Sequence, residues 1–317
     1  MEHQSLLLER CDPDQLLNVI DGTDFRHQVL PGGSPCVRTE KLRLQWGVLQ
    51  RGWYGMRVIA DGAMPQGLIS VGFITGNAPS TSINGVFCRP YSVQLYAEGA
   101  DVHYHAAPEN SWVAYCVERE RLQQAALSLL GQPLPIPDSN AISVQPDEAG
   151  GRRLAATVEA LFALATYPEP EASILALSQQ LEEQLQYDIA RAVIHSSSRH
   201  CHREAARVAQ RRRIMQHAED YLRANLLEHF SLGDLARATG TSHRMLQYHF
   251  RSIYGVTPQQ WFRSMKLNAI RRELKRSRGT GLRVSDVAVR CGFLHFGRFS
   301  QEYRRLFREH PSETLRP

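Results

Sequence analysis

This sequence of 317 residues has few features of a membrane protein or a secreted protein. No apolar stretch approaches the length that crosses a bilayer, and the first ten residues, MEHQSLLLER, contain no apolar run of signal-peptide length. The six cysteines are scattered and form no C-x-x-C pair, so the sequence indicates neither a disulfide framework nor a zinc ribbon. We therefore expect a cytoplasmic protein that has no membrane partner.

Sequence motifs of phosphate binding and hydrolysis are also missing. The chain has no glycine-rich phosphate loop, no G-x-S-x-G and no Ser/His/Asp signature. One candidate metal site is the pair His103 and His105, because alternate residues of a strand share a face. No third or fourth ligand lies at a recognisable spacing, so we predict no metal, no cofactor and no catalytic residue.

Positive charge is scarce in the first two thirds of the chain and concentrated in the last third. Residues 199–317 contain 24 Lys and Arg against 10 Asp and Glu, a net charge of +14, whereas residues 1–198 carry −9. This segregation indicates a nucleic-acid-binding part and a second part with another task. A membrane surface is a weaker explanation, because no long apolar face accompanies the basic residues.

A helical unit occurs twice in the basic segment, at about residues 231–254 and 284–308. The alanine and the glycine of the first copy, Ala236 and Gly240, recur 52 residues later in the second. The small residue lets two helices cross closely, and the glycine suits the left-handed conformation that turns the chain. Each copy therefore has the pattern of a helix-turn-helix, and a long helix is predicted between them.

The second helix of each copy has an apolar face and a polar face. Leu246 and Phe250 lie four residues apart and face the core, as do Phe299 and Tyr303 in the second copy. The residues beside these stripes carry groups that can contact base edges in a major groove. The predicted DNA-binding residues are His243, Arg244, Gln247, Tyr248, His295, Arg298, Ser300 and Gln301.

Taken together, the two copies resemble the DNA-binding domain of the AraC/XylS family of bacterial transcription regulators, over residues 212–317. The resemblance is carried by Ser242, Leu246, Phe250, Gly255, Thr257, Pro258, Gly292, Phe293, Phe299, Ser300, Tyr303, Arg304 and Pro311. It implies a regulator, usually an activator, that binds promoter DNA and contacts RNA polymerase. The second copy is also similar to the branch that contains the ethanolamine-operon regulator.

One residue departs from the family pattern. Arg308 stands where the family has a glycine at the end of the second recognition helix, while the first copy keeps Gly255. A non-glycine residue in the left-handed conformation costs about 1 kcal/mol or more. The sequence therefore leaves open how the second recognition helix ends.

The N-terminal half has the pattern of a β domain. Short alternating or apolar runs recur between Gly, Pro and Asn turns over residues 28–117, which favours a sandwich or a barrel. The resemblance implies a cupin-like barrel at this position. Its aromatic residues either fill the core or, together with Arg51, line a pocket for a small effector of unknown identity. These aromatic residues are Trp46, Trp53, Tyr54 and Trp112.

The predicted fold class is α+β, with a β-rich regulatory domain at residues 1–145 and the DNA-binding domain at residues 212–317. A short helix is predicted at residues 13–20, and the four prolines of residues 133–146 indicate a linker. Residues 146–198 are predicted to form a helical pair. Residues 199–211 are predicted to be a linker, either a hinge or a helix that continues into the DNA-binding domain.

The second helix of this pair, at residues 171–195, carries a long apolar stripe, and its opposite face is polar. The candidate dimerisation residues in the stripe are Leu177, Leu181, Leu185 and Ile189. The polar face contains Gln180, Glu182, Glu183 and Gln186. A helix must bury its stripe, but the sequence leaves open whether it packs on the same chain or on a second copy, as the family often does.

Two functions remain on this evidence. The first is a sequence-specific, homodimeric transcription regulator in which each protomer contacts two successive major-groove segments. The second is a cupin-type metal enzyme that carries a DNA-binding module. A metal assay on the purified protein distinguishes them.

Overall fold

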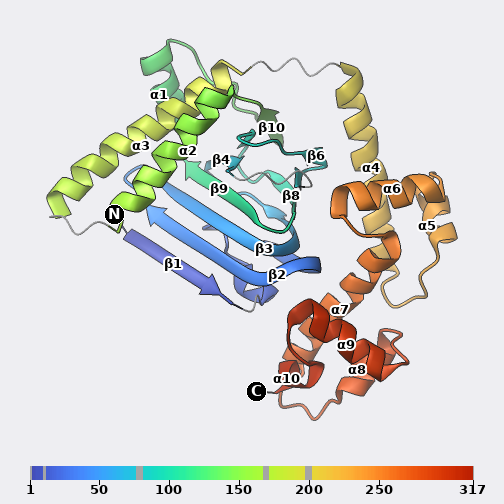
Figure 1. Cartoon of the computed structure of the whole chain (residues 1–317). Helices are drawn as coiled ribbons and strands as arrows, with labels where there is room; N and C mark the ends of the chain where they lie inside the picture. The colour runs from blue at the N-terminus through green and yellow to red at the C-terminus, as the bar shows by residue number, and fades with distance from the viewer. Residues whose placement is uncertain (1, 10–11, 76–80, 167–170, 197–201, 317) are drawn as a thin grey trace.

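A computed structural model describes residues 2–9, 12–75, 81–166, 171–196 and 202–316, with backbone only at residues 171–172 and 202–209. The sheet lies between a group of three helices and the C-terminal helices (Figure 1). None of the described helices is long and apolar enough to cross a bilayer.

The N-terminal half is an antiparallel half-barrel, which confirms the predicted β-rich, cupin-like domain. Strands β10, β7, β4, β9, β3, β8, β5 and β6 follow one another across the sheet, and β2 joins β1 to β3. The strands are β1 (Glu2–Leu8), β2 (Arg26–Arg43), β3 (Gly47–Ala63), β4 (Ile69–Ile74), β5 (Ser82–Ile83), β6 (Val86–Phe87), β7 (Val93–Tyr96), β8 (Asp101–Ala106), β9 (Asn110–Val117) and β10 (Ala141–Val144).

The sheet curves because its two longest strands bend. The first half of β3 pairs with β9 and its second half pairs with β8. The register of β2 against β3 shifts on both sides of Gly33, which has φ +78°. A Cβ atom at Gly33 would lie 2.0 Å from the carbonyl oxygen of Gly55, so this bulge requires glycine.

Three helices cover one face of the half-barrel: α1 (Arg119–Leu130), α2 (Glu148–Leu164) and α3 (Glu171–Ile194). Their apolar side chains share one core with the sheet, where Leu161, Leu185 and Ile189 lie in the same cluster as Val71 and Val113. Helices α2 and α3 were predicted from the sequence, but α1 was not.

Two local predictions are wrong. Residues 133–146 do not form a linker throughout, because β10 pairs with β7. The helix predicted at residues 13–20 is reduced to a single 3₁₀ turn, Pro13–Leu16, which Asp12 caps. In both places the hydrogen bonds available in the fold outweigh the local sequence signal.

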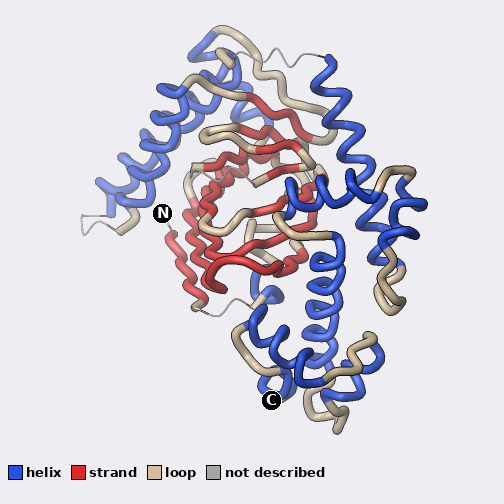
Figure 2. Tube along the Cα trace, turned by 45° about the vertical axis from the view of Figure 1, so that its right-hand side comes forward, coloured by secondary structure: helices blue, strands red, loops and turns tan. Residues whose placement is uncertain are grey.

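The C-terminal domain is entirely helical (Figure 2). Its helices are α4 (His202–Ala224), α5 (Leu232–Thr239), α6 (His243–Tyr254), α7 (Pro258–Arg276), α8 (Val284–Arg290), α9 (Phe296–Phe307) and α10 (Pro311–Leu315). From residue 202 onward the segment predicted as a hinge or a helix belongs to α4. A capping box between Thr257 and Gln260 starts α7, whose 19 residues span about 28 Å.

The half-barrel packs directly on this helical domain. Leu30 of β2 and Ile59 of β3 lie in the same apolar cluster as Phe250 and Trp261. The side-chain amide of Asn268 accepts a bond from the backbone N–H of Val29 (3.0 Å) and donates to its carbonyl oxygen (2.9 Å). The two halves therefore share both apolar and hydrogen-bonded contacts.

Candidate DNA-binding interface

The first recognition helix, α6, is positioned by the turn before it. Gly240 ends α5 in the left-handed conformation (φ 62°), and the Ser242 hydroxyl accepts a hydrogen bond from the backbone N–H of Met245 (3.2 Å). Leu246 and Phe250 are fully buried. The predicted turn and inward stripe of the first copy are confirmed.

The predicted contact residues of α6 lie on its outer side. His243, Arg244, Gln247 and Tyr248 are all exposed, and Tyr248 is 62% exposed. Within the described part of the chain, neither Arg244 nor Gln247 has a hydrogen-bond or ion-pair partner. Their donor and acceptor groups are therefore available to a ligand.

The second recognition helix, α9, repeats this arrangement. Gly292 turns the chain with φ 78°, and Phe299 and Tyr303 are buried. The predicted residues that α9 and its N-cap expose are His295, Arg298 and Gln301. Ser300 is only half-buried, and its hydroxyl lies 3.4 Å from Nδ1 of His310. Ser300 is thus the least available of the predicted set.

Two further features of α9 were not part of the predicted set. The Arg298 guanidinium donates to Glu302 (3.0 Å), and Glu302 also binds Arg263 of α7, so Arg298 is held in place by an ion-pair network. Leu294 and Phe296 are exposed at the N-terminus of the helix, where apolar groups can contact thymine methyls.

Arg308 ends α9 in the way that Gly255 ends α6. Arg308 has φ 58° and ψ 19°, and Gly255 has φ 64° and ψ 11°. Each donates its backbone N–H to the carbonyl four residues earlier, at 2.8 and 3.0 Å. Helix α9 therefore ends in the same left-handed conformation as α6, with an arginine where the family has a glycine.

Arg308→Gly is expected to stabilise the protein by about 1 kcal/mol, because glycine takes the left-handed conformation without a steric cost. Arg305→Gly, three residues earlier in the same helix, is the matched control and should cost about 1 kcal/mol. Urea denaturation of both variants measures the two changes. If Arg308→Gly lowers the stability, the left-handed backbone conformation of Arg308 is not strained.

Gly255 is also the point where the half-barrel reaches the first recognition helix. A Cβ atom at Gly255 would lie 2.5 Å from Cζ of Arg57, which projects from β3. Burial lowers the pKa of Arg57, and its Nε and Nη1 atoms have no hydrogen-bond partner in the described residues. The end of α6 is thus in direct contact with the N-terminal domain.

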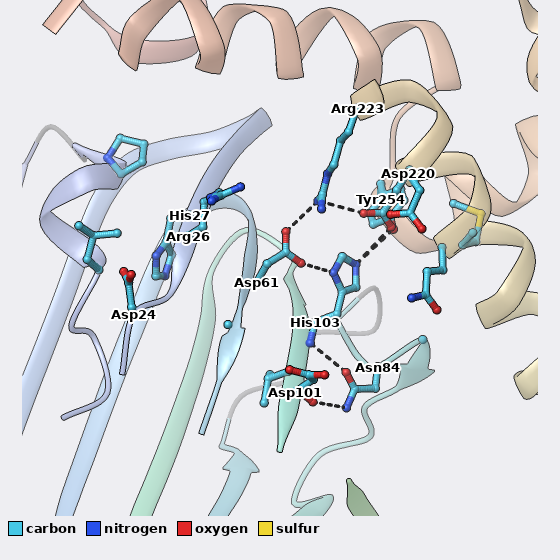
Figure 3. A pocket seen from close by; sticks show the side chains of 18 of the residues that line it. Asp24, Arg26, His27, Asp61, Asn84, Asp101, His103, Asp220, Arg223 and Tyr254 are labelled. Atoms are coloured by element: carbon cyan, nitrogen blue, oxygen red, sulfur yellow. Dashed lines mark hydrogen bonds and ion pairs between the residues drawn. The ribbon is translucent and has the colours of Figure 1, made fainter. Parts of the chain in front are cut away.

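Beside this contact, a charged cluster joins the half-barrel to α4 and α6 (Figure 3). Arg223 of α4 binds Asp61 of β3 (2.8 Å) and Glu219 (3.1 Å). His103 of β8 binds Asp61, lies 3.4 Å from Glu219 and 3.3 Å from the hydroxyl of Tyr254. Tyr254, the last residue of α6, donates its hydroxyl to Glu219. All five residues are linked.

The charges in this cluster shift the pKa values of its members. Burial lowers the pKa of His103, but the Glu219 charge and the hydrogen bond to Asp61 outweigh it and raise that pKa to about 9. For Asp61, burial raises the pKa, and the bond to His103 and the charge of Arg223 bring it below its usual value. At neutral pH, His103 is therefore a cation between two carboxylates.

The His103 and His105 pair, considered above as a metal site, instead contacts α6. The His103 ring centroid lies 6.4 Å and the His105 ring centroid 5.4 Å from that of Tyr254, both edge-on. Among the described residues, no group of three His, Cys, Asp or Glu is arranged to hold a metal ion.

The aromatic residues of the half-barrel are divided between its core and its surface. Tyr54 and Trp112 are buried and line a small internal cavity of about 60 Å³. Trp46 is instead covered by the guanidinium of Arg121, whose Cζ lies 3.8 Å from the ring centroid. A space of this size holds only a few water molecules.

The candidate dimerisation residues of α3 fall into two groups. Leu185 and Ile189 are fully buried and Leu181 is partly buried against the half-barrel of the same chain. Leu177 is 45% exposed and its neighbour Leu175 is 47% exposed. Among the described residues of α3, the exposed leucines therefore lie in its first half.

Comparison with known proteins supports the DNA-binding assignment. Residues 235–317 match the family described as helix-turn-helix domain. The chain is 28% identical over 204 residues to the probable thc operon regulatory protein of Rhodococcus erythropolis, covering 64% of this chain and 60% of that protein. It is 38% identical over 104 residues to the XylDLEGF operon transcriptional activator of Pseudomonas putida, covering 33% of this chain and 31% of that protein.

The chain is also 31% identical to a probable AraC family transcriptional regulator of known structure from Rhodopseudomonas palustris CGA009. That match covers 33% of this chain and 98% of the other, with a TM-score of 0.31. The chain spans less than two thirds of the length of both curated relatives. The similarity to the ethanolamine-regulator branch stays a prediction.

Proposed function

This chain belongs to the AraC/XylS family of helix-turn-helix transcription regulators, and we propose that it activates transcription by binding promoter DNA as a homodimer. The observation that carries the proposal is the pair of helices α6 and α9, each behind a left-handed glycine turn and each exposing polar side chains. Activation is supported by the operon activator among the relatives. An activator also contacts RNA polymerase, which is therefore a further proposed partner. The family is one of regulators, so the metal-enzyme hypothesis is not retained.

Each protomer reads two successive major-groove segments. Helix α7 separates the two recognition helices by about 28 Å of helix, close to the ~34 Å between successive major-groove segments on one side of B-DNA. Arg244, Gln247, Arg298 and Gln301 carry the groups that pair with guanine or adenine edges. Base readout therefore falls on these four side chains.

Alanine at any one of these four positions is expected to weaken operator binding by roughly 1–3 kcal/mol and to leave the fold intact, because each side chain is exposed. Genomic immunoprecipitation first identifies the operator, and fluorescence anisotropy at fixed salt then measures its affinity. A scrambled duplex is the control, and its weaker binding should stay unchanged. If all four variants bind the operator like the wild type, these helices do not read the bases.

The homodimer forms through the first half of α3. Leu175 and Leu177 are exposed there, and α1, which contacts α3 through Arg121 and Glu183 (3.6 Å), adds the exposed Leu127 and Leu129. Isolated leucines are common on surfaces, but here two packed helices each expose two of them. Both helices lie on the side of the half-barrel away from the DNA-binding helices (Figure 1).

Leu177→Asp is expected to yield monomers in analytical ultracentrifugation and to reduce affinity for a two-site promoter at least tenfold, because the tethering of two DNA readers is lost. Leu227→Asp is the matched control: Leu227 is 65% exposed and lies between α4 and α5. A Leu177→Asp protein that stays dimeric places the interface elsewhere.

A further inference from the structure

A cavity of about 780 Å³ lies between the half-barrel and the DNA-binding domain. Strands β2, β3 and β8 line one side, and α4, the end of α6 and α7 line the other. The cluster of Asp61, His103, Glu219, Arg223 and Tyr254 forms part of its wall (Figure 3). It is far larger than the cavity inside the half-barrel.

Cations outnumber their carboxylate partners where α7 meets this cavity. Helix α7 carries Arg271, Arg272, Lys275 and Arg276 within six residues. The carboxylates that pair with them are Asp12, which binds Arg271 (2.7 Å) and Lys275, Asp14, which accepts from Lys275 at 3.0 Å, and Glu309, which binds Arg271 (3.0 Å). Asp12 and Asp14 are thus already engaged, and Arg272 and Arg276 have no hydrogen-bond or ion-pair partner among the described residues.

A third arginine without a bonded partner among the described residues lines the half-barrel side of the cavity. Arg26 at the start of β2 is the cross-strand neighbour of Asp61, but that carboxylate binds His103 and Arg223 instead. In Figure 3, Arg26 lies apart from the bonded cluster. The remaining acidic side chains of the lining, those of Asp24, Asp101 and Asp220, are exposed to solvent.

Arg26 and Arg276 both act on Arg272. Arg272 is half-buried, and burial together with the positive charges of Arg26 and Arg276 lowers its pKa. The carboxylate that opposes this effect is that of Asp14, which Lys275 already binds. Three guanidinium groups thus border one cavity without a bonded carboxylate among the described residues.

We propose that Arg26, Arg272 and Arg276 bind the carboxylate or phosphate group of a small organic anion in this cavity. Guanidinium groups match the planar, bidentate geometry of such oxyanions. Because Arg26 belongs to the half-barrel and the other two belong to α7, the anion bridges both domains and stabilises their present arrangement. This consequence for DNA binding rests on the proposed function, whereas the binding itself does not.

The experiment titrates the full-length protein with inorganic phosphate and, separately, with citrate, and follows the melting temperature at ionic strength held constant with sodium chloride. One or both anions should raise the melting temperature in a saturable way, and the arm that saturates at lower concentration distinguishes phosphate from carboxylate. Arg272→Gln should weaken that binding at least tenfold, because it removes a charge-assisted contact. Arg38→Gln is the control, since Arg38 is an exposed arginine of the same strand as Arg26 and does not line the cavity.

The proposal is overturned if neither anion acts beyond chloride, or if Arg272→Gln and Arg38→Gln change the response equally. Should Arg272→Gln fold poorly, Arg26→Gln on β2 makes the same test. Operator binding is measured in parallel without added anion. If Arg272→Gln weakens it there, the arginines contact the DNA backbone and the proposal is wrong. If operator binding persists while the anion response is absent, the proposed function stands and only the anion site fails.

Discussion

Glu182→Ala is expected to lower the free energy of unfolding by about 3 kcal/mol, because it leaves the buried Tyr115 hydroxyl and two part-buried backbone N–H groups without an acceptor. Glu182 lies in α3 and is fully buried. Its carboxylate accepts hydrogen bonds from the Tyr115 hydroxyl (2.7 Å), from the backbone N–H of Gln45 (2.9 Å) and from that of Trp46 (3.2 Å). One side chain thus joins α3 to β9 and to the turn between β2 and β3.

Two variants make this a controlled measurement by urea denaturation. Glu182→Gln keeps one carbonyl acceptor and should lose only about 1 kcal/mol. Glu183→Ala removes the neighbouring exposed carboxylate, whose contact with Arg121 is 3.6 Å long, and should change stability by less than about 0.5 kcal/mol. Equal losses in Glu182→Ala and Glu183→Ala would mean that the buried carboxylate does not hold α3 on the sheet.

Stability is expected to fall as the pH rises from about 6.5 to 9, because His103 loses its proton over this range. A group whose folded pKa is raised, here from 6.5 to about 9, contributes stability below its unfolded pKa and loses it as the pH passes the folded value. The pKa of Asp61 is lowered from 3.8, so its carboxylate contributes stability above that pH, and this contribution is lost in acid. The charged cluster is therefore strongest between about pH 4 and 6.5.

The expected loss is about 2 kcal/mol, less than the full pKa shift implies, since the His103 side chain is 28% exposed and water screens its charge. His103→Gln should remove most of this pH dependence. His217→Gln is the control, because His217 is an exposed histidine of α4, which also carries Glu219 and Arg223. Unfolding curves at several pH values compare the three proteins, and an unchanged slope in His103→Gln contradicts the assignment.

The helix-turn-helix copies could be predicted from the sequence because their signals are local. A turn glycine such as Gly240, a cap such as Ser242 and an inward pair such as Leu246 and Phe250 act within one or two helical turns. The charge difference between the two parts of the chain is likewise a property of composition alone. These features determined the family and the kind of ligand.

Helix α3 illustrates what local signals cannot decide. Its alternation of apolar and polar residues predicted a helix, but Glu182 and Gln186 of the polar face are fully buried while Leu177 is exposed. A carboxylate is buried there because donors from distant strands converge on it, and such convergence is set by the fold. The same reason applies to β10, whose partner β7 lies more than forty residues earlier in the chain.

The contacts between the two domains were decided only by the tertiary structure. Arg26 and Arg272 lie 246 residues apart in the sequence, and nothing near either one indicates that they border the same cavity. Likewise the His103 and His105 pair has the spacing of a metal site, but in the fold both rings contact Tyr254 at the end of α6. Local sequence thus determined the DNA-reading helices, whereas the packing of distant segments decided which charges remain unpaired, because electrostatic partners depend on distance in space.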